Sequence, residues 1–387
     1  MPLPLNRLPR GRELARLIAT GAAWLAVFAV AGVIGGLLFT WSGLYSVAAS
    51  RGHWPGFGLL LEFGMRSSVR THALGIAVPD LSDRALVERG AAHFQGGCAP
   101  CHAAPGQPAS PIVRAMLPEP SDLKTVVPTW KPNQLFWIVK NGLKYTGMPG
   151  WSAPERDDEV WAVVAFLQQL PSMDTETYRA LASLEPRATE VPIRLLAQGG
   201  PAEMGLTACS RCHGLDGLGR SSGAFPRLDI QSADYLFDQL QAYASGRRQS
   251  GIMQPVAAEL EAREMRRLAD YYAGRRTAQS PPRQQPAHGL SPDLGQRLFV
   301  DGLAEQGIPS CASCHAQPAP GQNRFYPALA GQYAGYTSHQ LRMFKAGKRQ
   351  GTPAADIMTV VARRMTEEQI DAVASYVARL PRLETRP

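Results

Sequence analysis

Three copies of one short motif contain the side chains best suited to chemistry. The motif is Cys-x-x-Cys-His, and it occurs at Cys98–His102, Cys209–His213 and Cys311–His315. Its copies use all six cysteines of the chain, which are Cys98, Cys101, Cys209, Cys212, Cys311 and Cys314. The first cysteines of successive motifs are 111 and 102 residues apart, so each domain-sized block of the chain contains one motif.

The spacing within the motif suits a covalently attached haem. Two thiols three residues apart on a helical turn can each bond one vinyl group, and the adjacent imidazole can then reach the iron. We therefore expect His102, His213 and His315 to be iron ligands in three haem c sites. Zinc needs about four ligands, and each block offers only three clustered candidates. A redox dithiol needs no histidine and normally follows a strand, so both alternatives fit less well.

A methionine downstream of each motif is the expected sixth iron ligand. Met148, Met253 and Met358 follow the motif histidines by 46, 40 and 43 residues. A soft thioether ligand raises the reduction potential relative to a second imidazole. Methionine is also a common core filler, and the blocks contain rivals at Met116, Met265, Met343 and Met365. The five remaining histidines, among them His339, are interpreted as surface or packing residues.

Helical periodicity accounts for the rest of each block. The blocks end in segments with apolar residues at helical spacing, at Asp157–Leu170, Glu259–Ala273 and Thr366–Leu380. They open with a glycine four residues before a large apolar residue, in the pairs Gly90/Phe94, Gly200/Met204 and Gly295/Phe299. Such a glycine allows two helices to cross closely. Because no alternating strand pattern is present, the expected fold is all-α.

The N-terminus predicts a membrane anchor. Residues 17–41 contain no charge, and as a helix these 25 residues are about 37 Å long, enough to cross a bilayer. Arg7, Arg10, Arg12 and Arg16 precede the stretch, and the next charge is Arg51, which predicts export of everything after the helix. A cleaved signal peptide is the alternative, although the apolar run is longer than is usual for one.

The second and third blocks are related by a tandem duplication. Eight residues recur at a constant offset of 101, from Pro226, Leu228, Tyr235, Gln239, Leu240, Gly246, Arg248 and Gln249 to Pro327, Leu329, Tyr336, Gln340, Leu341, Gly347, Arg349 and Gln350. The first block lacks this match. A segment rich in proline and glutamine separates the two repeated blocks and is expected to be a linker.

These motifs resemble those of class I c-type cytochromes over about residues 85–383. The second and third blocks resemble a dihaem cytochrome of the c4 type in the segments FPRL and YPAL and in QLQAYASGRR and QLRMFKAGKR. The first block resembles a single-haem class I cytochrome in CAPCH and GMPGW. The resemblance implies that Pro226, Leu228, Pro327 and Leu329 lie beside the haems. Block three departs from block two by extra residues before Cys311 and before Met358.

The expected organisation follows from these assignments. It comprises a cytoplasmic tail (1–16), a transmembrane anchor (17–41), a juxtamembrane connector (42–84), cytochrome c domain 1 (85–171), cytochrome c domain 2 (193–275), a linker (276–289) and cytochrome c domain 3 (290–383). An apolar patch in the connector rests either on the membrane surface or on a domain. The fold is thus one transmembrane helix followed by three helical domains around one haem each.

Composition and ligation restrict the function. A hydrophobic content of 45% excludes a disordered chain, and the net charge of +8 includes no basic run that would suit nucleic acid. Irons with two filled axial positions indicate an electron carrier and not an enzyme. We expect a single-pass protein of a bacterial inner membrane, with its haem domains in the periplasm.

Three functional hypotheses remain. The first is a relay between respiratory partners, such as a quinol-oxidising complex and a terminal oxidase. The second is the electron-accepting cytochrome subunit of a periplasmic dehydrogenase. The third, a dihaem peroxidase, requires an iron with an open position.

Overall fold

The computed structural model describes residues 11–48, 50–54, 56–182, 205–221, 223–275, 292–316, 323 and 325–381. The chain divides into two compact units, Met1–Gly58 with Ala115–Pro118 and Leu59–Arg114 with Glu119–Pro387. Most of the expected tail, the linker at 276–289 and the start of the second domain, with Gly200 and Met204, lie outside the described residues.

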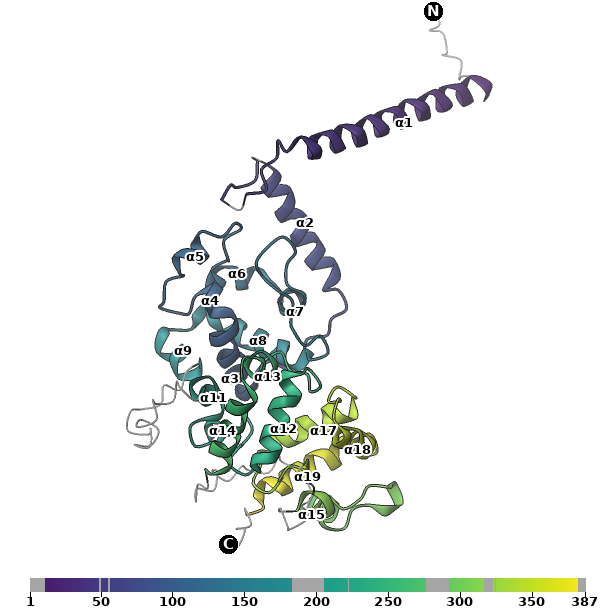
Figure 1. Cartoon of the computed structure of the whole chain (residues 1–387). Helices are drawn as coiled ribbons and strands as arrows, with labels where there is room; N and C mark the ends of the chain where they lie inside the picture. The colour runs from purple at the N-terminus through teal and green to yellow at the C-terminus, as the bar shows by residue number, and fades with distance from the viewer. Residues whose placement is uncertain are drawn as a thin grey trace, which may run out of the picture. The chain divides into compact units, whose positions relative to one another are not determined.

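The N-terminal unit contains one long apolar helix. Helix α1 spans Gly11–Ser42, and within it Ala15–Ser42 has a mean hydropathy of 2.3 (Figure 1). In the described part of the chain this is the one helix long and apolar enough to cross a membrane. Tyr45 then packs edge-on against Trp54, with ring centroids 5.4 Å apart. Helix α1 fits the expected membrane anchor, and a signal sequence has the same pattern.

Helices form all the regular elements of the second unit that the structure describes, apart from one isolated bridge between Leu303 and Ile308. The expected all-α fold is therefore confirmed. The connector and first block contain α2 (Phe57–His72), α3 (Arg84–His93), the π-helix η1 (Phe94–Cys98), α4 (Ala99–His102), α5 (Pro111–Arg114), α6 (Leu123–Val126), η2 (Val127–Thr129), α7 (Pro132–Asn141), α8 (Asp157–Gln169), η3 (Leu170–Ser172) and α9 (Thr175–Ala182).

The second and third blocks repeat a common order of helices (Figure 1). The second contains α11 (Leu206–His213), η5 (Gly219–Ser221), α12 (Ala233–Ala244), α13 (Met253–Ala258) and α14 (Ala262–Ala273). The third contains α15 (Pro292–Val300), η6 (Ala304–Gln306), α16 (Ala312–His315), α17 (Ala334–Lys345), α18 (Pro353–Arg363) and α19 (Glu367–Arg379). In every block the motif histidine is the last residue of a short helix, namely α4, α11 or α16.

Glycines allow the first and last helices of a block to cross closely. A Cβ atom on Gly90 of α3 would lie 2.0 Å from the carbonyl oxygen of Ala162 on α8. A Cβ atom on Gly295 of α15 would lie 2.4 Å from the carbonyl oxygen of Ala372 on α19. Aromatic rings pack beside both crossings, because Phe94 lies 5.1 Å from Phe166 and Phe299 lies 5.6 Å from Tyr376. The predicted crossings are confirmed in the first and third blocks.

The core of the first block extends beyond the boundaries expected for it. On the N-terminal side, Val69 of α2 is buried in that core, and the guanidinium of Arg66 lies 5.0 Å from the ring centroid of Trp130. On the C-terminal side, Tyr178 of α9 is buried in it and donates a hydrogen bond to Gln95. The block therefore includes residues on both sides of 85–171, while Leu59 at the start of the connector helix is 73% exposed.

Replacing Gly295 with alanine should destabilise the third block, because the new methyl group meets backbone atoms of α19 that cannot move independently. Overpacking of this kind costs about 1–3 kcal/mol. The matched control is Gly335→Ala on α17, where nothing lies within 4 Å of the added atom. Thermal unfolding followed by circular dichroism should show a lower midpoint for Gly295→Ala alone. Equal midpoints for the two variants would contradict the close crossing.

Candidate functional site

One hydrogen bond orients each motif histidine. The Nδ1 atoms of His102, His213 and His315 lie 2.9, 3.2 and 2.9 Å from the backbone carbonyl oxygens of Ser121, Pro226 and Pro327. A carbonyl oxygen can only accept, so Nδ1 donates its proton and Nε2 retains its lone pair. This is the tautomer that a metal-binding imidazole needs, and a carbonyl is a usual partner for its second nitrogen.

Burial keeps two of these imidazoles neutral. His213 and His315 are each 8% exposed. Burial lowers the pKa of both side chains, and the hydrogen bond to the proline carbonyl opposes the shift. A neutral imidazole is the form that binds a metal. His102 is half-buried, so the first block holds its histidine in a more open environment.

A shared cavity of about 350 Å³ joins the candidate sites of the second and third blocks. Its lining includes the predicted residues of both sites, Cys209, Cys212, His213 and Met253 with Cys311, Cys314, His315 and Met358. The prolines and leucines expected beside the haems, Pro226, Leu228, Pro327 and Leu329, line it as well. The structure thus brings together, within each of these blocks, side chains about 40 residues apart in sequence.

The candidate site of the first block contains the same kinds of residue, and these pack against the hydrophobic core of that block. Cys98 and Met148 both pack against the first hydrophobic cluster, whereas Cys101 is exposed. The Met148 loop is held locally, because Met148 N–H donates to Thr146 Oγ1 at 3.1 Å and the Met148 carbonyl accepts from Leu143 N–H at 3.2 Å.

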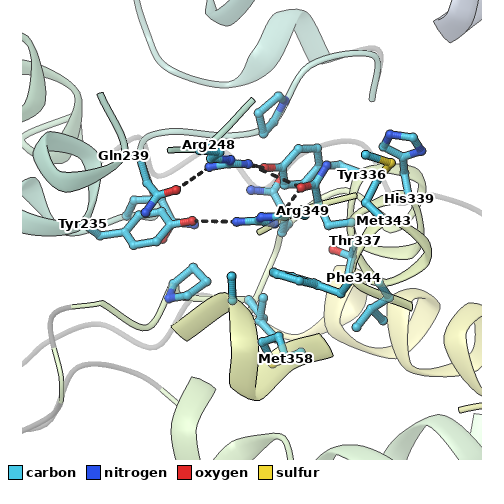
Figure 2. Close-up of a pocket in the computed structure, with 18 of the residues that line it drawn as sticks. Tyr235, Gln239, Arg248, Tyr336, Thr337, His339, Met343, Phe344, Arg349 and Met358 are labelled. Atoms are coloured by element: carbon cyan, nitrogen blue, oxygen red, sulfur yellow. Dashed lines mark hydrogen bonds between the residues drawn. The ribbon is translucent and has the colours of Figure 1, made fainter. Parts of the chain in front are cut away.

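The rival methionines occupy three kinds of position. Met265 is a core residue that is 5% exposed, and Met116 belongs to the N-terminal unit. Met343 and Met365 line the shared cavity together with Met358, and they are 7% and 3% exposed. Figure 2 shows Met358 and Met343 on different helices around this cavity.

Arginines at equivalent positions of the duplication lie near each other in the cavity wall, since both donate to Gln340 Oε1. Arg248 donates to Gln239 of its own block at 2.6 Å and to Tyr336 of the other block at 3.4 Å (Figure 2). Arg349 repeats this arrangement, donating to Gln340 at 2.6 Å and to Tyr235 at 3.4 Å. Each block therefore completes the hydrogen bonds of the other through residues at equivalent positions.

A second set of reciprocal hydrogen bonds joins the same two blocks. The carboxamide of Gln231 donates to Ala328 O at 2.9 Å and accepts from Ala328 N–H at 3.0 Å. The carboxamide of Gln332 donates to Arg227 O at 3.1 Å and accepts from Arg227 N–H at 3.0 Å. All four residues are related by the offset of 101. The two blocks consequently form a closely bonded pair.

The donor set fits haem c better than the zinc or dithiol alternatives. Burial raises the pKa of Cys98 to about 12 and that of Cys209 and Cys311 to about 11, whereas redox-active dithiols have lowered values. Within the described residues no three side chains of His, Cys, Asp or Glu gather as a zinc ion requires. Among those same residues Arg248 and Arg349 bond to neutral partners only, which suits the acidic propionates of a haem.

Sequence reasoning did not identify a function for these arginine and tyrosine pairs or detect the glutamine pair. The signal was present, because Tyr235, Gln239 and Arg248 were among the recurring residues, and Gln231/Gln332 is a further identity in the same register. His339, interpreted as a surface or packing residue, lies with Nε2 3.0 Å from Asp158 Oδ2 of the first block.

Comparisons with known proteins agree with this geometry. Residues 85–167 match the family described as cytochrome c oxidase, cbb3-type, subunit III, and residues 292–381 match the family described as cytochrome c. The thiosulfate dehydrogenase electron acceptor of Stutzerimonas stutzeri (strain A1501) is 37% identical over 213 residues, which cover 53% of this chain and 93% of that protein.

Two further relatives are of similar kinds. The thiosulfate dehydrogenase electron acceptor of Thiomonas intermedia is 37% identical over 46% of this chain and 81% of its own length. Cytochrome c4 of Stutzerimonas stutzeri is 31% identical over 46% of this chain and 88% of its own length. The chain therefore belongs to the c-type cytochromes, as a c4-like, multi-haem electron carrier with covalently bound haem c.

Proposed function

We propose that this chain is a membrane-anchored, three-haem cytochrome c of the bacterial inner membrane, with its haem domains in the periplasm. It relays electrons between respiratory partners, toward a terminal oxidase. The observation that carries the proposal is the threefold repetition of one arrangement, a motif histidine whose Nδ1 donates to a backbone carbonyl and whose Nε2 is left for iron.

Each residue of the motifs has a defined role in this proposal. The six cysteines hold three haems by thioether bonds, through Cys98, Cys101, Cys209, Cys212, Cys311 and Cys314. The histidines His102, His213 and His315 are the fifth ligands, and Met148, Met253 and Met358 are the sixth. When bound, haem supplies one-electron redox chemistry.

The surrounding residues stabilise this arrangement and exclude water from it. The shared cavity is lined largely by apolar side chains, including Leu268 and Val373, which are 2% and 3% exposed. Arg248 and Arg349 provide cationic partners for acidic groups at its polar side. Filled axial positions leave no iron for a substrate, which supports outer-sphere electron transfer over a peroxidase activity.

The anchor determines where the carrier works. Helix α1 is long and apolar enough to span a bilayer, and the arginines before its uncharged stretch at 17–41 favour a cytoplasmic N-terminus. Attachment to the membrane replaces free diffusion with a high local concentration of membrane-bound partners. A terminal oxidase is one such partner, and the match of residues 85–167 to an oxidase subunit family supports it.

A second candidate function is that of electron-accepting subunit of a periplasmic dehydrogenase. The specific observation in its favour is the 37% identity to two proteins named as thiosulfate dehydrogenase electron acceptors. In that role the chain receives electrons from a catalytic partner that oxidises a small inorganic sulfur anion. Both candidate functions use the same haem sites. They differ only in the partner protein that exchanges electrons with this chain.

Replacing Met358 with alanine should leave the haem of the third block covalently bound but lower the reduction potential of that centre, because the soft sulfur ligand is lost. The control is Met343→Ala, which removes another buried methionine of the same cavity and should lower stability by about 2–5 kcal/mol instead. A redox titration distinguishes them. If the potential moves for Met343→Ala and not for Met358→Ala, Met343 is the ligand.

Intact mass spectrometry of the native complex in detergent should find three haem groups on the chain and retention of residues 1–50. Oxidase subunits in the same complex support the relay, and a catalytic dehydrogenase subunit supports the second candidate. A chain with fewer than three haems contradicts the proposed sites. A chain that begins near residue 50 contradicts the anchor, because the helix would then be a removed signal.

A further inference from the structure

The first block contacts the loop before Met253 of the second block through one buried carboxylate. Glu159 lies in the first turn of α8 and is 6% exposed. Its Oε1 accepts a hydrogen bond from Ser250 Oγ at 2.6 Å, and its Oε2 accepts one from Gly251 N–H at 2.6 Å. Ser250 is itself 2% exposed, so this contact is shielded from water.

Neighbours of Glu159 support the same loop. Arg156 Nη2 lies 2.9 Å from Glu159 Oε1, and Arg156 Nη1 donates to the Gln249 carbonyl at 2.8 Å. The indole of Trp151 covers the loop so closely that a Cβ atom on Gly251 would lie 2.1 Å from Trp151 Nε1. Three consecutive residues, 249–251, are therefore held by side chains of the first block.

The hydrogen bonds continue from Glu159 to the backbone of Met253. Ser250 Oγ, which donates to Glu159, accepts from Met253 N–H at 3.0 Å and from Ile252 N–H at 3.2 Å. Met253 is the first residue of α13, and it lines the shared cavity with Cys209, Cys212 and His213. The Glu159 carboxylate thus fixes the Ser250 hydroxyl. That hydroxyl in turn holds the N-terminus of α13, where Met253 is the first residue.

The other two methionine loops are held differently. The Met148 loop is held by Thr146 and Leu143 of its own block. Met358 lies within α18, whose first turn is capped by Thr352 of the same block. Asp157 of the first block also lies 3.9 Å from Lys348 Nζ in the loop before Met358, but that ion pair is half-exposed, whereas the Glu159 contact is buried.

We propose that Glu159 of the first block is a positioning residue for the Met253 loop, so that docking of the first block determines how well this methionine reaches its iron. The inference rests on the proposed role of Met253 as sixth ligand. Without the carboxylate, Ser250 loses the acceptor for its proton and Gly251 N–H is left buried without a partner, which destabilises this conformation of the loop. The loop then relaxes, and the sulfur withdraws from the ligand position.

The test compares Glu159→Ala with Glu159→Gln in the full-length protein. The readouts are the sulfur-to-iron charge-transfer band of the ferric protein and a redox titration of all centres. We expect Glu159→Ala to lose the part of the band that belongs to one centre and to lower the potential of that centre. Glutamine keeps one acceptor oxygen and should restore most of both. Intact mass verifies that each variant retains its haems.

The matched control is His339→Ala. It removes a different contact of the first block, the one between Asp158 and His339 of the third block, and His339 makes none of the described hydrogen bonds of the Met253 loop. If Glu159 only holds the first block against the rest of the protein, His339→Ala and Glu159→Ala should have the same spectra. The positioning role predicts a change for Glu159→Ala only.

Met253→Ala separates failure of this inference from failure of the proposed function. If Met253→Ala removes the band of one centre while Glu159→Ala leaves the spectrum and potentials intact, the positioning role is wrong and the ligand assignment stands. If Met253→Ala changes neither, the ligand assignment itself is wrong. In the double variant, Glu159→Ala should add nothing to Met253→Ala, because the two residues act on the same bond.

Discussion

The three candidate sites depend on one hydrogen bond, from the Nδ1 atom of each motif histidine to a backbone carbonyl further along the chain. That bond selects the tautomer and fixes the plane of the ring. In the repeated blocks the acceptor is the carbonyl of Pro226 or Pro327, and the leucine two residues later lies in the cavity wall. A rigid proline segment thus supplies both the orientation of the ligand and the apolar surroundings of the site.

The second and third blocks form a pair because residues on each side complete the hydrogen bonds of the other. Arg248 with Tyr336 and Arg349 with Tyr235 make one such exchange, and Gln231 and Gln332 make another with backbone groups. A buried polar group without a hydrogen-bond partner destabilises the folded protein. Separation of the two blocks would therefore leave these groups without their partners. This is why the two candidate sites share one cavity.

Much of the fold follows from local sequence. Helix α8 was expected at Asp157–Leu170 and spans Asp157–Gln169, because its apolar face is regular. Helix α14 begins at Ala262 and not at Glu259, because Glu261 and Glu264 form a capping box that starts the helix there. Contacts between residues 90 or more positions apart, such as Glu159 with Ser250, have no periodic signature, and sequence reasoning missed them.

In the reciprocal hydrogen bonds between the second and third blocks, the two halves of the duplication are equivalent. The first block removes that equivalence, since it holds the loop of Met253 through buried hydrogen bonds of Glu159, whereas its contact with the loop before Met358 is a half-exposed ion pair between Asp157 and Lys348. Two haems bound in such a pair experience different surroundings even where their ligands are of the same type. The added block therefore adds to the differences between the two halves of the duplicated unit, which already place Met253 at the start of α13 and Met358 within α18.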